Sequence, residues 1–99
     1  MATYDGLSRF AYNELKQFRH AELEILSLEQ LMKLSPEAPS PELVQKASVF
    51  ANKHGLPSVK TCAEVVALCR SLLSLAYEAT GTESLKELLQ FIAEIKRFF

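Results

Sequence analysis

The chain has 99 residues, of which 48% are hydrophobic and 23% are charged, and its 11 basic and 12 acidic residues give a formal net charge of −1. Such a chain suits one domain with a single modest core, and its interspersed charges disfavour nucleic acid and anionic membranes as partners. No apolar run reaches the roughly 18 to 20 residues of a membrane-spanning helix, and the N-terminus lacks the pattern of a secretory signal. We therefore expect one intracellular, cytoplasmic domain over residues 1–99.

The first predicted element is an amphipathic helix from about Leu7 to Leu26, because apolar residues recur there at helical spacing. Several leucines leave this apolar stripe, and a straight helix cannot bury them on one side: Leu23, Leu26, Leu31 and Leu34. The run Ser27-Leu28-Glu29-Gln30 matches a capping box, which is typical of a helix start. We therefore expect a break or kink near Ser27, followed by a short helix over 28–34.

The segment SPEAPSPE holds three of the four prolines and predicts an extended linker. Ser40 followed by Pro41 is typical of a helix start, since serine caps free amides and proline suits the first helical position. This helix should run to about Lys53, where Gly55 provides a left-handed stop. Leu56 is then expected to fold back onto the helix end.

A second capping box, Thr61-Cys62-Ala63-Glu64, predicts a helix to about Ala79, although Ser58 offers a start one turn earlier, and Gly81 ends it. Thr82 can cap a last amphipathic helix whose apolar residues recur every three or four positions: Leu85, Leu88, Leu89, Ile92, Ile95 and Phe99. No strand pattern is present. We expect an all-α, compact bundle of four or five helices, with the helix over 61–79, the most apolar, at its centre.

The residues that carry catalysis or bind metals do not form a recognisable set. The Glu-x-x-His pairs of helical di-iron sites are missing, since Gln17 precedes His20 at that spacing. His54 stands at a helix end, where a cationic imidazole interacts favourably with free carbonyls. Phosphate-binding loops and nucleophile elbows are also missing. We therefore expect no enzyme and no cofactor.

The two cysteines, Cys62 and Cys69, lie on one helical face about 10 Å apart along the axis, too far for a disulfide. Their simplest role is as small core residues. An alternative is a small enzyme or ligand carrier with a pocket around these two thiols, which native-state alkylation would distinguish.

Aromatic and small residues indicate surfaces for association. Phe10 and Tyr12 are 200° apart on a helix, so they cannot both face one core. Phe98 and Phe99 end the chain, and aromatic residues are enriched at interfaces. Small side chains at Ala63 and Ala67 would let another helix approach closely. These six residues are the candidate interface, although a core role for the aromatics stays open.

The run from Glu42 to Gln90, about half the chain, resembles the helical N-terminal domain of COMMD proteins, which are eukaryotic adaptors and scaffolds. The likeness lies in helix lengths, leucine placement and the Thr-Glu-Ser start of the last helix. The tryptophan-containing C-terminal domain of that family is missing, since the chain has no tryptophan. The resemblance implies an intracellular interaction domain without catalytic residues, and it transfers no site.

We therefore expect a non-catalytic protein–protein interaction module, an adaptor, scaffold or regulatory subunit, whose partner is another protein or a second copy of itself. The rivals are the enzyme or carrier described above and a dimeric nucleic-acid-binding regulator. For the latter, Arg9, Lys16 and Arg19 share one side of the first helix, but they would neutralise few phosphates.

Overall fold

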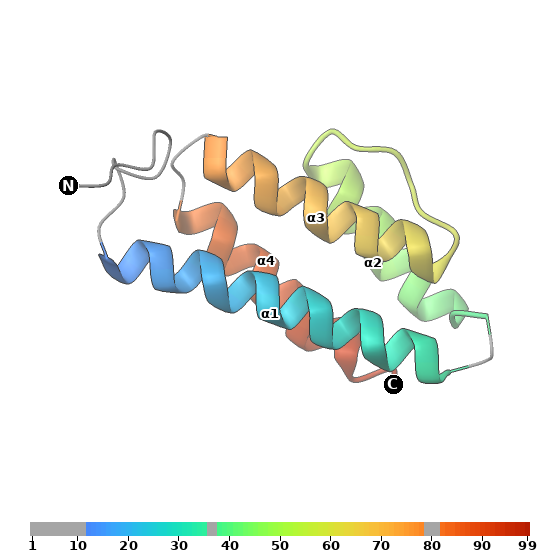
Figure 1. Cartoon of the computed structure of the whole chain (residues 1–99). Helices are drawn as coiled ribbons and strands as arrows, with labels where there is room; N and C mark the ends of the chain where they lie inside the picture. The colour runs from blue at the N-terminus through green and yellow to red at the C-terminus, as the bar shows by residue number, and fades with distance from the viewer. Residues whose placement is uncertain (1–11, 36–37, 79–81) are drawn as a thin grey trace.

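A computed structural model describes residues 12–35, 38–78 and 82–99, and within these ranges the regular elements are four helices (Figure 1). They are α1 (Tyr12–Leu34), α2 (Pro41–Lys53), α3 (Cys62–Glu78) and α4 (Thr82–Lys96). The described part of the chain contains no strand. The predicted all-α bundle is therefore confirmed, while Phe10 and the predicted helix start at Leu7 lie outside the described residues.

The expected break near Ser27 is wrong, because α1 is one uninterrupted helix of 23 residues. Its buried residues continue through the supposed break at alternating spacings of three and four: Phe18, Ala21, Ile25, Leu28 and Met32. One face of a single helix therefore packs on the bundle along its whole length.

The leucines that lie off this stripe stay partly or largely in contact with solvent, and the helix does not bend to bury them. Leu23, Leu26 and Leu34 are exposed, and Leu31 is half-buried. Ser27 does not cap a helix, since its Oγ accepts a hydrogen bond from Lys96 Nζ at 3.2 Å. The same ammonium group donates to Glu24 Oε1 at 2.7 Å, so this part of α1 is fastened to the end of α4.

Helix α2 begins and ends as the sequence predicts. The Leu43 amide donates to Ser40 Oγ at 3.1 Å, and Pro41 occupies the first helical position. At the other end Gly55 has φ 76°, the left-handed conformation that glycine adopts without strain. The Gly55 amide donates to the Asn52 carbonyl and the Leu56 amide to the Ala51 carbonyl, the bond pair of a Schellman motif. Leu56 consequently folds back against the core.

Side chains of α2 and α3 hold the connection between these helices near its α3 end. Ser48 Oγ donates to the Val59 carbonyl and accepts from the Val59 amide, both at 3.1 Å, so Val59 is held in the core. At the start of α3 the Glu64 amide donates to Thr61 Oγ1, while Glu64 Oε1 accepts from the Thr61 amide. The predicted capping box is confirmed, and α3 begins directly after Thr61.

The centre of the bundle is α4 rather than α3, which corrects the expected arrangement. Helix α4 lies close to all three other helices and its inward side chains are fully or almost fully buried: Leu85, Leu88, Phe91, Ile92 and Ile95. In Figure 1, α4 passes behind α1, and α2 packs on α4 through the stacked rings of Phe50 and Phe91. The most apolar helix, α3, is therefore not the most enclosed one, and one side of it stays open.

The expected place of Phe99 on the apolar stripe of the last helix is also wrong. Helix α4 ends at Lys96, and the last three amides bond to carbonyls three residues earlier instead of four. This tighter winding turns the end of the chain off the stripe. Phe98 and Phe99 are each 38% exposed. The expected stop at Gly81 falls outside the described residues.

Candidate functional site

A large hollow lies between α1 and α3, on the side away from α4. It has a volume of ≈ 670 Å³ and is lined on α1 by Glu22 and Leu26 and on α3 by Arg70, Ser74 and Tyr77. Leu26 is 46% exposed at its rim. Phe18 and Tyr77 close its floor with an edge-to-face contact at 4.9 Å between ring centres.

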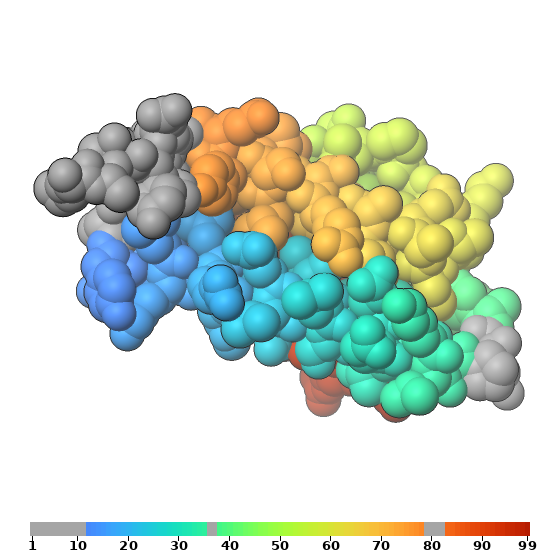
Figure 2. Space-filling view, viewed as in Figure 1, coloured from blue at the N-terminus to red at the C-terminus, as the bar shows by residue number. Residues whose placement is uncertain are grey.

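A second hollow of ≈ 410 Å³ continues along the same two helices. Lys33 and Glu29 line it on α1, and Ala63, Ala67 and Arg70 line it on α3. Arg70 borders both hollows, and we call the two hollows together the α1/α3 groove. Figure 2 shows this face, with α1 (blue to teal) and α3 (yellow to orange) side by side along it.

One ion pair crosses the α1/α3 groove. Arg70 Nη2 donates to Glu29 Oε1 at 3.1 Å, and this is the only ion pair between α1 and α3 among the described residues. Both partners keep part of their surface in water, so the pair is worth little to stability. Its effect is to divide the groove into two halves with unlike linings.

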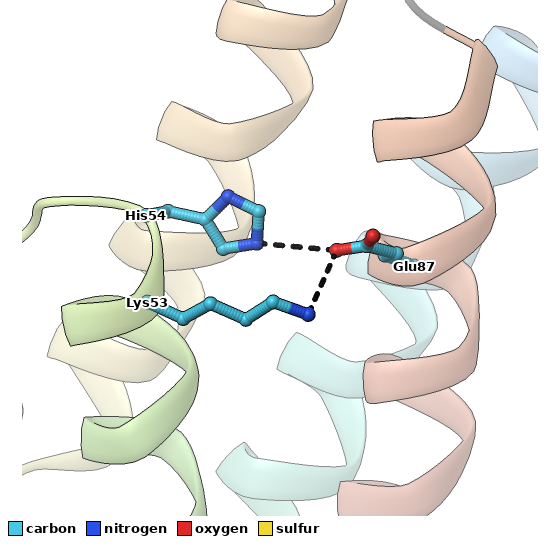
Figure 3. Close-up of polar contacts among 3 residues, drawn as sticks. All are labelled: Lys53, His54 and Glu87. Atoms are coloured by element: carbon cyan, nitrogen blue, oxygen red, sulfur yellow. Dashed lines mark hydrogen bonds and ion pairs between the residues drawn. The ribbon is translucent and has the colours of Figure 1, made fainter.

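The seam between α2 and α4 has a different character, because ion pairs close it. Lys46 pairs with Glu94 at 3.2 Å, and Lys53 Nζ lies 3.5 Å from Glu87 Oε2. Figure 3 shows His54 directed at the same carboxylate, with Nε2 3.5 Å from Oε2, a close approach rather than a hydrogen bond. The hollows on this side are ≈ 280 Å³ and ≈ 390 Å³, smaller than the larger half of the α1/α3 groove.

His54 itself has a structural position, although not the one expected. Its backbone amide caps α2 by donating to the Ala51 carbonyl at 3.0 Å. The ring turns away from the helix end and packs edge-to-face on Phe50, which in turn stacks on Phe91 at 4.2 Å between ring centres. His54 thus joins α2 to α4 through an aromatic cluster.

The predicted interface residues fall in three separate places. Ala63 and Ala67 line the α1/α3 groove, and both are exposed. Phe98 borders the hollow beside exposed Val49 of α2. Tyr12 is 71% exposed at the start of α1 and carries Lys16 Nζ 4.8 Å from its ring centre. Since Tyr12 lies about 18 Å along α1 from Glu24, which binds Lys96, Tyr12 does not join the C-terminal phenylalanines in one aromatic patch.

The two cysteines have unlike surroundings. Cys69 is fully buried in the core, and burial raises the pKa of its thiol to about 12. Cys62 is half-buried at the groove, where burial also raises its pKa. Neither thiol has the lowered pKa of an activated nucleophile, because burial raises both pKa values. Cys69 lines none of the hollows described above, so the two thiols do not share one pocket.

We expect Cys69 to resist alkylation in the folded protein. At pH 8 a thiol with a pKa near 12 is a thiolate in about one molecule in ten thousand, so labelling should be at least roughly a thousandfold slower than for a free cysteine. The measurement is the rate of iodoacetamide labelling of a Cys62→Ser variant, with and without urea. Rapid labelling without urea would contradict the burial of Cys69 and favour the enzyme or carrier alternative.

Other kinds of site find no support in the described ranges. They contain no group of three or more His, Cys, Asp or Glu residues placed to hold a metal ion. In the same residues, no helix is long and apolar enough to cross a membrane. Searches against protein families, curated proteins and solved structures found no match to this chain.

Sequence reasoning found one wall of the α1/α3 groove and missed the other. The sequence indicates Ala63 and Ala67 as a small-residue face of α3. Leu26, Glu22 and Lys33 of α1 were not recognised. The available signal was that Leu26 lies 100° from Ile25, at the edge of the apolar stripe. That position indicates a leucine facing a groove beside the core as well as it indicates a helix break.

Proposed function

We propose that this protein is a non-catalytic interaction module, intracellular and cytoplasmic, whose α1/α3 groove binds an amphipathic helix. The observation that carries the proposal is the groove itself, whose lining combines exposed Leu26 and two exposed alanines with charged side chains from both helices. Helix-in-groove binding is a common mode of recognition, in which the guest helix lays its apolar face between two host helices. The resemblance to the helical domain of COMMD adaptors agrees with such a role.

The size of the groove suits this kind of ligand. Helix α3 has 17 residues and is about 25 Å long, so a guest helix of four to five turns would match it. Exposed alanines leave space for a second helix backbone, and Leu26 offers an apolar side chain to a guest. With α4 already packed on the other side, a guest would place α1 and α3 between two helices.

Replacing Ala67 with glutamate should abolish this binding. The probe is a display library of amphipathic helices, from which binders to the folded protein are selected. We expect their affinity to fall at least about tenfold for Ala67→Glu, because a carboxylate would enter an apolar contact. The matched control is Val49→Glu, which places the same charge on α2, where Val49 is 62% exposed. Binders that lose affinity only for Val49→Glu would place the binding surface on α2 and contradict the proposal.

A further inference from the structure

The charges at the two ends of the α1/α3 groove are opposite. Glu22 lies in the half near the start of α1, and Lys33 lies in the half near its end. Among the described residues neither side chain has an ion-pair partner, whereas Glu29 and Arg70 between them satisfy each other. The groove therefore offers one unpaired carboxylate and one unpaired ammonium group, separated by the paired centre.

The two halves of the groove also differ in the size of their exposed side chains. The half with Glu22 carries Leu26, whose large side chain is 46% exposed. The half with Lys33 carries the exposed small side chains of Ala63 and Ala67. One half of the groove thus combines an exposed leucine with a negative charge. The other half combines small side chains with a positive charge.

Two copies of this surface are complementary in charge when their α1 helices run antiparallel. Glu22 and Lys33 are 11 positions apart, about 16 Å along α1, so each lies about 8 Å from their midpoint. A two-fold axis through that midpoint brings Glu22 of one copy to Lys33 of the other, and the reverse. It also sets Leu26, which lies about 2 Å along α1 from that midpoint, opposite Leu26 of the second copy. A parallel arrangement would set like charges together.

We propose that the occupant of the α1/α3 groove is a second copy of this chain, docked antiparallel about a two-fold axis. This inference rests on the proposed function, because it names the partner of the same groove. An isologous contact of this kind uses one face of each copy and closes at the dimer. Two Glu22–Lys33 ion pairs flank the contact and Leu26 fills it near the axis.

Charge reversal tests the proposal, since each single substitution changes two contacts by symmetry. Sedimentation velocity over a wide range of concentrations would give the dimer dissociation constant of the native chain, Glu22→Lys, Lys33→Glu and the double variant. We expect each single reversal to weaken the dimer about tenfold and the double variant to restore it. Lys16→Glu, on the face of α1 away from α3, should leave the dimer unchanged. Circular dichroism verifies that each variant is folded.

Three outcomes would overturn the proposal. They are a native chain that stays monomeric at every concentration, a dimer that neither single reversal weakens, and a double variant that stays as weak as the single ones. The helix-binding measurement on Ala67→Glu separates this failure from that of the proposed function. If selected helices still need Ala67 while the chain is monomeric, the groove binds a different protein. If neither result is found, the α1/α3 groove is not an interaction site.

Discussion

Replacing Leu88 with alanine is expected to lower the free energy of unfolding by about 3 kcal/mol, within the usual range of 2 to 5 kcal/mol for a buried leucine. Leu88 is fully buried on α4, the helix that lies close to all the others, so the cavity left by its side chain cannot be filled by a small movement of one neighbour. Urea unfolding followed by circular dichroism measures the loss. This loss would be a large fraction of the total free energy of unfolding of a domain this size.

The matched control for Leu88 is another leucine in a helix. Leu75 of α3 is exposed, so Leu75→Ala removes little buried surface and should cost less than about 1 kcal/mol. Equal losses from the two substitutions would show that α4 is not the centre of the bundle.

Replacing Ser27 with proline is expected to cost about 3 kcal/mol or more. Ser27 lies in the middle of the continuous helix α1, where proline removes a backbone hydrogen bond and clashes with the preceding turn. The side chain of Ser27 is exposed, so the effect comes from the backbone. Urea unfolding again provides the measurement.

The control at this position is Ser27→Ala, which keeps the helix and loses only the hydrogen bond with Lys96. We expect it to change the free energy of unfolding by no more than about 0.5 kcal/mol. If proline were tolerated as well as alanine, α1 would have to be broken near Ser27, as the capping-box pattern alone predicts.

Both ends of α2 and the start of α3 were predictable from sequence, because they depend on local chemistry. Ser40, Gly55 and the Thr61–Glu64 box act within a few residues of themselves, and each functions as expected. Ser27 shows the limit of this reasoning. It has the sequence of a cap, but Leu28 and Met32 gain more by staying on the buried face of an unbroken helix.

The arrangement of the helices was less predictable, since it depends on contacts between distant residues. High apolar content suggested α3 as the central helix, yet α4 is the more enclosed. Part of the apolar surface of α3 instead lines the α1/α3 groove. The high apolar content of α3 led to the wrong prediction that it is central. The same apolar content makes the open side of α3 a candidate binding site.

The candidate site was half predictable. Ala63 and Ala67 stand out because small residues recur on one face of an apolar helix. Tyr12 and Phe98 stand out in the sequence as aromatics, but helical rise keeps Tyr12 far from the end of α4. Glu22 and Lys33 carry no local signal, since unpaired charges on a helix are common. Their spacing of 11 residues places them on one face of α1, and the packing of α1 against α3 turns that face into one side of a groove.

The most direct test of the α1/α3 groove is amide chemical-shift mapping of the isotope-labelled protein with a saturating selected helix. The groove account predicts that the shifted amides cluster on α1 between Glu22 and Lys33 and on α3 between Ala63 and Tyr77, with α2 almost unchanged. Shifts centred on Val49 and Phe98 would contradict it, because the binding surface would then lie on the other side of the bundle.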